Sequence, residues 1–518
     1  KVTCQRKHIS YDIFPKERRY PLKKSGSITV FTSLFLAVFL LVFQVLLQSV
    51  QIGGGRVQAE TGVEEGLYSV FAGYDRELLE RYHVFMVDGS YGTGVWKPEC
   101  MYQTVKKCME ESCRPDGAIS GVRGENLWKC SSVSGAITAY TLMSDEHGRG
   151  YRAQAVDYMK ETLGIQGIQL LMKKYEQQKD IFEQQEKRGS DIDVKQSMDS
   201  YEKARKEAGQ NQGQDPDNTG QQPAVVQVPA DFVNPLDVIR QLQKKSILAL
   251  VVPAGKELSQ KGLPKEKRLS RREKQTGMGI PFYGAQEDTV LTRGIFQAYM
   301  MQHLTDYTSM EHATDPLRYQ LEYVIGGKNT DQENLKAVVY RLLAAREAAN
   351  MMYLLQDPTR QAEIHEMALV ICAAIGFPAL EGIVSLALQA AWAFGESLLD
   401  VRQLLTGGKV PLVKTGDTWM VSLHQLAKIT ELLKNSRAVE QKGMTYQEYL
   451  GILLMTGKSE VQTERTMDIV EAVIRGMSGK ENFRLDQGVI YLEVDMGVTF
   501  AEKTFSLQRD YGYAMGSD

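Results

Sequence analysis

Four cysteines lie close together in the first third of the chain, and thiol chemistry is the first that the sequence suggests; they are Cys100, Cys108, Cys113 and Cys130. Zinc sites of the finger or ribbon type place paired thiolates two to four residues apart. Cys108 and Cys113 come nearest to that spacing, but no second pair accompanies them. In an oxidising compartment these thiols would instead form disulfides. We therefore predict two disulfides here, with free thiols and a metal site as the alternatives.

The seven histidines match no known metal or catalytic pattern. His365-Glu366 lacks the second histidine that a zinc-protease helix places four residues after the first. His303, Glu311 and His312 could meet at a metal ion, although isolated surface histidines are far more common. The sequence therefore predicts no metal site.

One carboxylate lies beside a tryptophan on a predicted helix, because Trp392 and Glu396 are four residues apart. An apolar neighbour can turn a carboxyl group into a general acid, but a glutamate bonded to structural partners is the more common case. The sequence also lacks a phosphate loop, a dinucleotide fingerprint and a nucleophile elbow. We therefore predict a protein that is not an enzyme and that uses no cofactor, with scattered acid and base groups as the open alternative.

Positive charge is concentrated in a basic segment from Lys256 to Lys274, which contains Lys256, Lys261, Lys265, Lys267, Arg268, Arg271, Arg272 and Lys274. Such a segment could face an anionic wall polymer or a lipid headgroup. Glu257, Glu266 and Glu273 interrupt it, so a solvated loop is the favoured interpretation. The whole chain carries a formal net charge of -3, which predicts no nucleic acid partner, and nothing indicates a small-molecule substrate.

An uncharged stretch near the N-terminus determines where the rest of the chain lies. About 20 mainly apolar residues, in a helix, span the roughly 30 Å of a bilayer core. Its expected lipid-facing side chains include Ile28, Phe31, Leu36, Phe39, Leu41, Phe43 and Leu47. Eight lysines and arginines precede it within residues 1–26, and such charges stay in the cytoplasm. We predict a single-pass anchor in the cell membrane, with a cytoplasmic N-terminus and the C-terminal bulk outside.

Three features of the flanking sequence refine this anchor. Val57-Gln58-Ala59 resembles a signal-peptide cleavage site, but the apolar region is longer than signals usually have, so a retained anchor is favoured. The three glycines at 53–55 are expected to loosen or bend the helix. Apolar residues at spacings of three and four from Leu67 to Tyr82 then predict that the anchor continues as a stalk helix.

The remaining patterns predict an α+β fold: the transmembrane helix and its stalk, an antiparallel sheet packed with helices, and a helical subdomain. Strands are expected over 83–88, 135–143, 247–252 and within 484–500. Asn234-Pro235 should begin one helix, and Thr330 with Glu333 has capping-box spacing at the start of another. Residues 367–399 predict a buried helical hairpin, because Gly376-Phe377-Pro378 divides them into pieces too short to cross a membrane.

The predicted organisation follows from these elements and from composition. Residues 207–230 include a run rich in Gly, Gln, Asn, Asp and Pro that cannot bury enough apolar surface to fold. The expected parts are a basic cytoplasmic tail (1–26), a transmembrane helix (27–50), a stalk and α+β region with the cysteines (51–206), a disordered linker (207–230), an α/β segment with the basic loop (231–316), a helical subdomain (317–480) and C-terminal strands (481–518).

Several stretches resemble a clostridial membrane-protein family of unknown function. They are residues 23–31 before the apolar stretch, Arg56 to Glu60 after it, Tyr74-Asp75-Arg76-Glu77-Leu78-Leu79, Leu321-Glu322-Tyr323-Val324-Ile325-Gly326-Gly327-Lys328 and Ala391-Trp392-Ala393-Phe394-Gly395-Glu396-Ser397. About the first 60 residues are also similar to the TadE and TadG pseudopilins of tight-adherence (Tad) pilus systems, which begin with a basic tail, a glycine and one apolar helix.

The resemblance implies a cell-surface component of a pilus or secretion assembly that binds envelope or pilus-assembly proteins. Prepilins usually carry glutamate five residues after the cleaved glycine, whereas Phe31 occupies that position counted from Gly26. An accessory component is therefore expected, and processing after Gly26 or after Ala59 stays open. The rival hypothesis is a membrane-tethered cell-wall binding module or hydrolase, for which the basic segment would be the anion-facing surface.

Overall fold

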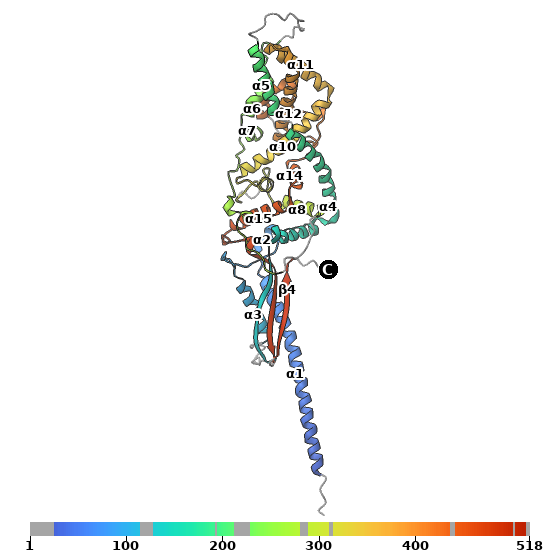
Figure 1. Cartoon of the computed structure of the whole chain (residues 1–518), viewed down its shortest axis with the longest axis vertical. Helices are drawn as coiled ribbons and strands as arrows, with labels where there is room; N and C mark the ends of the chain where they lie inside the picture. Colours follow the sequence, from blue (N-terminus) through green and yellow to red (C-terminus); the bar gives the residue numbers. More distant parts are fainter. Residues whose placement is uncertain are drawn as a thin grey trace, which may run out of the picture. The chain divides into compact units, whose positions relative to one another are not determined.

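The computed structural model describes residues 25–113, 128–191, 194–211, 228–279, 289–309, 314–435, 441–500 and 503–513. Helices predominate and the strands form an antiparallel sheet, so the predicted α+β class is confirmed (Figure 1). The chain divides into two compact units. The first contains residues up to 65 with 106–135 and 496–507, and the second contains 66–105, 136–495 and those from 508 onward. Most of the predicted cytoplasmic tail and linker lies outside the described residues.

The N-terminal apolar stretch forms one helix, α1 (Ser25–Phe71), which continues through the glycines at 53–55. Within the first unit, a Cβ on Gly54 would collide with the ring of Trp128, and a Cβ on Gly55 would lie 2.9 Å from the ring of Phe500. The predicted loosening or bend was therefore wrong, because these glycines let two aromatic rings lie directly against the helix backbone. Close packing of this kind offsets the low helix propensity of glycine.

Within the described residues, two helical stretches are long and apolar enough to cross a membrane, Ile28–Phe71 and Pro378–Leu405. The apolar window of the first is 0% buried by the described chain, whereas that of the second is 72% buried. The second stretch contains α12 (Glu381–Leu405), which packs beside α11 (Pro358–Ile375). The predicted buried hairpin is thus confirmed, and α1 is the helix that could span a membrane.

Beyond the glycines, α1 buries one face that includes Ala59, Val63 and Leu67. This face meets α3 (Pro98–Cys113) at two glycines four residues apart. In the first unit a Cβ on Gly62 would lie 2.9 Å from the Met109 Cα, and in the second unit a Cβ on Gly66 would lie 2.7 Å from the Val105 Cα. Small residues at this spacing let two helix backbones approach closely.

The predicted stalk helix does not continue to Tyr82. α1 ends at Phe71, and Asp75 caps a separate helix, α2 (Arg76–Tyr82), by accepting a hydrogen bond from the Leu78 amide at 3.0 Å. The buried face of α2 holds Leu78 and Tyr82. The spacing of apolar residues predicts helix correctly, but Asp75 is an N-cap that begins a new helix, and this was not predicted.

The sheet consists of β1 (Val87–Asp88), β2 (Cys130–Leu142), β3 (Gly488–Phe500) and β4 (Lys503–Gly512). β3 is central, with β1 and β2 as its neighbours in the strand order and β4 also paired to it. β1 is antiparallel to β3, with Val87 opposite Val489. The strands predicted within 135–143 and 484–500 are confirmed, whereas only the last two residues of 83–88 are extended in the sheet.

The other helices belong to the second unit: α4 (Asp145–Asp191, kinked at Gly164), α5 (Val194–Asn211), α6 (Pro235–Gln243), α7 (Ile247–Val251), α8 (Val290–His303), α9 (Gln320–Gly326), α10 (Asp331–Gln356), α13 (Ile429–Asn435), α14 (Tyr446–Met455) and α15 (Ser459–Arg475). The predicted N-cap at Asn234 and the capping box of Thr330 with Glu333 are both confirmed. The predicted strand over 247–252 was wrong, because a short buried apolar run has no periodicity to distinguish a strand from a helical turn.

Candidate functional site

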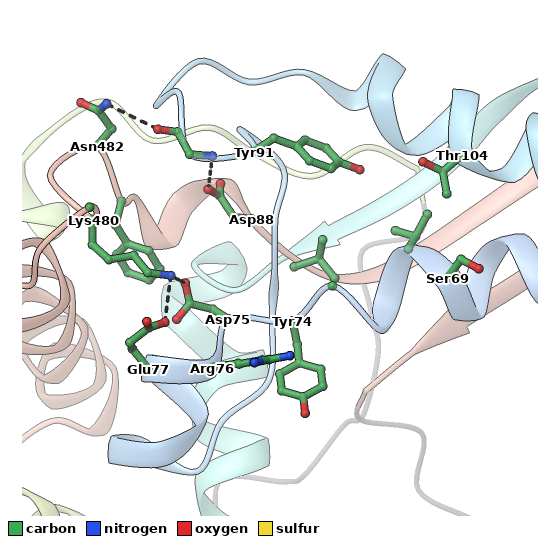
Figure 2. Close-up of a pocket in the computed structure, with 16 residues that line it drawn as sticks. Ser69, Tyr74, Asp75, Arg76, Glu77, Asp88, Tyr91, Thr104, Lys480 and Asn482 are labelled. Carbon is green, nitrogen blue, oxygen red and sulfur yellow. Dashed lines mark hydrogen bonds and ion pairs between the residues drawn. The ribbon is translucent and has the colours of Figure 1, made fainter.

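A cavity of about 460 Å³ lies in the second unit, beside the junction of α1 and α2 (Figure 2). Its walls come from the end of α1, the first turn of α2, β1 with the turn that follows it, Thr104 of α3 and residues 479–483 between α15 and β3. This volume is typical of ligand-binding sites, which range from about 300 to 1,000 Å³. Four successive residues of the resemblance, Tyr74-Asp75-Arg76-Glu77, line it.

Lys480 is clamped between two carboxylates at one wall of this cavity. Its Nζ lies 2.6 Å from Asp75 Oδ2 and 3.0 Å from Glu77 Oε2. Burial opposes the charged form of Lys480, but these bonds outweigh it and raise the pKa of the ammonium group. The bond from Lys480 in turn lowers the pKa of Glu77. Lys480 and Glu77 therefore stay charged at neutral pH.

The turn after β1 presents an aromatic ring at the opposite wall. Asp88 accepts hydrogen bonds from the amides of Ser90 and Gly92 at 2.8 and 2.7 Å, which fixes the turn. Tyr91, inside the turn, has φ of 51°, a left-handed conformation that is costly for a residue with a side chain. Figure 2 shows the Tyr91 side chain extending toward Thr104. Partial burial raises the pKa of Tyr91, so its hydroxyl keeps its proton at neutral pH.

The ion pairs of Lys480 and the neutral hydroxyl of Tyr91 favour ligand binding over proton transfer. The lysine is held protonated, the glutamate ionised and the phenol neutral, whereas a general acid or base needs a pKa near the working pH. Among the described residues, no three His, Cys, Asp or Glu side chains lie together as a metal site requires. The cavity is therefore suited to recognising a polar ligand.

Glu396, which the sequence offered as a possible general acid, belongs to a different and fully buried network. Its carboxylate lies 2.6 Å from Lys414 Nζ and accepts hydrogen bonds from the amides of Met420 and Val421. Lys414 also pairs with Asp400 at 2.8 Å, and Asp400 pairs with Arg346 at 3.0 Å.

The environment of this network fixes its charges. Burial raises the pKa of Glu396. Burial also opposes ionisation of Asp400, but Arg346 and Lys414 outweigh it and hold its pKa below the ordinary value. Every oxygen of Glu396 is used to hold residues 414–421 against α12, so the structural interpretation of this glutamate is the better one.

A second buried carboxylate, Glu322, has no cation bonded to it in the part of the chain that the structure describes. The Tyr307 amide and the Tyr446 hydroxyl each donate to Glu322 Oε1 at 2.8 Å. Burial, with a smaller contribution from Asp306, raises the pKa of Glu322 to about 8. Glu322 is therefore protonated at neutral pH.

The basic segment is largely bonded to the protein itself. Arg268 is 2% exposed and donates to the carbonyls of Leu263 and Lys328. Arg272 forms ion pairs with Glu471 and Asp486, and further bonds involve Lys256, Lys261 and Lys274. The predicted solvated loop was wrong for these five cations, because their partners lie on distant parts of the sequence. Lys265, Lys267 and Arg271 remain exposed.

The candidate disulfide cysteines lie on α3, with Cys130 at the start of β2. Cys108 and Cys113 are five residues apart on one helix, about 7.5 Å along its axis, which exceeds the roughly 7 Å that a disulfide can bridge. Cys100 is farther still from both. The two predicted disulfides would need one bond between two cysteines of α3, which the geometry of that helix does not allow.

The histidines of the sequence hypothesis do not form a site within the described residues. His303 lies beside His83, with ring centroids 5.3 Å apart, and burial with this neighbour lowers the pKa of His303 to about 4. His365 is bonded to Glu381 at 2.8 Å. Glu311 and His312 lie outside the described residues.

Sequence reasoning missed the cavity because its walls come from two distant parts of the chain, residues 69–104 and 479–483. One local signal was available. Asp75 followed by a short amphipathic run is an N-cap pattern, and a break there leaves Arg76 and Glu77 at a helix end rather than within a stalk. Nothing local indicates that Lys480 would reach them.

A family model matches part of the chain. Residues 228–500 match a family described as a family of unknown function, DUF5702. No curated protein and no solved structure matches the chain. The match includes the stretches at 321–328 and 391–397, so the predicted membership in a family of unknown function is confirmed over this region. The similarity to TadE and TadG lies outside it and stays a prediction.

Proposed function

The chain belongs to the DUF5702 family of unknown function, and we propose that it is a single-pass, membrane-anchored accessory component of a pilus or secretion assembly. In this role it acts outside the cell by binding other envelope proteins. The N-terminus lies in the cytoplasm, as the basic residues before the apolar stretch favour.

The observation that carries this proposal is the continuity of α1. Its apolar half leaves large side chains open to solvent, with Phe31 70% and Val45 65% exposed. Such a surface needs lipid or other apolar helices around it. Its second half is packed by α3 and by aromatic rings of the same chain. One continuous helix therefore carries both the apolar surface and a face packed by the folded chain, which suits a component that binds partners beside the membrane.

The alternative of a cell-wall binding module or hydrolase loses its main support. It depends on the basic segment as an anion-facing surface, yet five of the eight cations are engaged within the protein. The other three cations, Lys265, Lys267 and Arg271, are too few for the continuous basic surface that the alternative assumes.

Site-specific photocrosslinking in native membranes tests the proposal. Val57 on α1 and Val413 after α12 are matched positions, since they are 62% and 61% exposed. A crosslinking residue at position 57 should give discrete adducts with envelope proteins, and the same residue at 413 serves as the control. Recovery of a solitary protein after mild solubilisation, with no protein adduct from position 57, would contradict the proposal.

A further inference from the structure

A separate cavity of about 270 Å³ lies in the second unit, between the mutually packed helices α4, α8 and α14. α4 is kinked beside it at Gly164, whose φ of 66° and ψ of 157° belong to a region that is essentially restricted to glycine. Met159 and Leu163 before the kink and Tyr175 after it all line the cavity. The kink therefore lets both halves of α4 face the same space.

The lining of this apolar cavity contains no charged side chain. Each of the three helices contributes a methionine, namely Met159, Met301 and Met455. The amide of Gln297, which is 4% exposed, is already used as a donor to the Gly451 carbonyl. Methionine side chains are flexible and polarisable, so walls of this kind adapt to a flexible apolar ligand.

A smaller cavity of about 70 Å³ adjoins the apolar one, because Gln297 and Met455 line both. Two charged side chains line this smaller cavity, Lys179 from α4 and Arg293 from α8, and both are positive. Lys179 also lies 3.6 Å from Glu183, but that pair is partly exposed to solvent and therefore weak. No described carboxylate lines either cavity. The apolar space thus ends beside a positive one.

We infer that the two cavities together bind a free fatty acid of medium chain length, with its alkyl chain in the apolar cavity and its carboxylate beside Lys179 and Arg293. Burial of the alkyl chain supplies affinity, and charge-assisted hydrogen bonds to the carboxylate fix the direction of the ligand. This ligand is additional to the protein partners of the proposed function and does not depend on them.

The sizes of the two cavities favour a fatty acid over other amphiphilic ligands. The apolar cavity is slightly smaller than the roughly 300 Å³ at which sites for drug-sized ligands begin, so it suits one short chain rather than the two long chains of a phospholipid. The smaller cavity suits a head group of few atoms. A protein segment would have to bring its backbone into that space as well.

Photolabelling of the full-length protein in lipid nanodiscs tests the inference. The probe is decanoate with a diazirine at the end of its chain, and peptide mass spectrometry locates the adducts. They should form on α8 and α14, near Met301 and Met455, and unlabelled decanoate should compete for them. Adducts on the apolar half of α1 are expected from probe dissolved in the bilayer, and they serve as the internal reference.

A matched probe and three variants separate the parts of the site. The corresponding alcohol probe, which lacks the charge, should label α8 and α14 about tenfold less than the acid does. Ala298→Phe fills the apolar cavity and should lower the yield relative to α1 by about tenfold or more, because several methylenes lose their burial. Lys179→Gln combined with Arg293→Gln changes side chains that are open to solvent, so this variant should fold, and it should lower the yield about tenfold. Lys265→Gln, at an exposed lysine elsewhere, should leave the yield unchanged.

Several outcomes would overturn the inference. Adducts confined to α1 would show that the apolar cavity takes no alkyl chain, and equal labelling by the acid and alcohol probes would remove the role of the two cations. Labelling of α8 and α14 by a photoreactive phosphatidylglycerol, with none by the free acid, would assign the cavity to a phospholipid chain. The position-57 crosslinks are measured independently, so the proposed function and this inference stand or fail separately.

Discussion

The cavity at Arg76 and the buried network at Asp400 use the same kinds of side chain but differ in how completely the protein satisfies them. In the network, the side chains of Arg346, Asp400 and Lys414 are at most 1% exposed, and each is bonded to another charged group. In the cavity, the side chain of Lys480 is 26% exposed and that of Glu77 is 44% exposed. Arg76 has no partner there among the described residues.

This difference separates charges that hold the fold from charges that are available to a ligand. A fully buried pair has lost its hydration, so removing one partner leaves an uncompensated charge in the interior. An exposed charge keeps its water and contributes little to stability. Each region includes part of a resembling stretch, Arg76 and Glu77 in one and Glu396 in the other, so resemblance alone does not tell recognition from architecture.

The largest effect on stability is expected when the buried network loses one of its charges. Lys414→Met would leave Glu396 and Asp400 without the ammonium group between them, and one carboxylate would have to take up a proton. The free energy of unfolding should fall by about 3–5 kcal/mol. Urea denaturation followed by circular dichroism measures it, with Lys265→Met as the control at an exposed lysine. A loss below about 1 kcal/mol would show that the network is not what holds residues 414–421.

The next largest effect is a dependence of stability on pH, and it comes from the buried carboxyl group of Glu322. Burial raises the pKa of Glu322 from 4.5 to about 8, so the folded protein holds this proton more tightly than the unfolded chain does. The resulting stability is complete below about pH 4.5 and is lost as the pH rises through 8. Between about pH 5.5 and pH 8 the loss should be about 3 kcal/mol.

Denaturation curves over this pH range test the prediction against two variants. Glu322→Gln cannot ionise, so its stability should lack this fall toward pH 8. Glu431→Gln, at an exposed glutamate, should keep the slope of the unaltered protein. If the unaltered protein is equally stable at both ends of the range, Glu322 is ionised in the fold and the account of this site is wrong.

Local rules predicted those parts of the fold that local interactions determine. The caps at Asn234 and Thr330 use side chains within three residues of the amides that they bond, and a sequence pattern can contain them. The partners of Arg272 are about 200 residues away, so its burial depends on how helices pack. The cavity also depends on distant residues, because Lys480 bonds to Asp75, which lies more than 400 residues earlier in the sequence.

The smallest effect on stability is expected at Arg76. An exposed arginine without a partner contributes little to folding, and its charge opposes the dipole of α2. Arg76→Gln should therefore change the free energy of unfolding by less than about 0.5 kcal/mol, with any change toward greater stability. Urea denaturation under the conditions used for Lys414→Met measures both variants together. A loss above about 1 kcal/mol at Arg76 would make this arginine a structural residue like Arg346, and the contrast between the two regions would disappear.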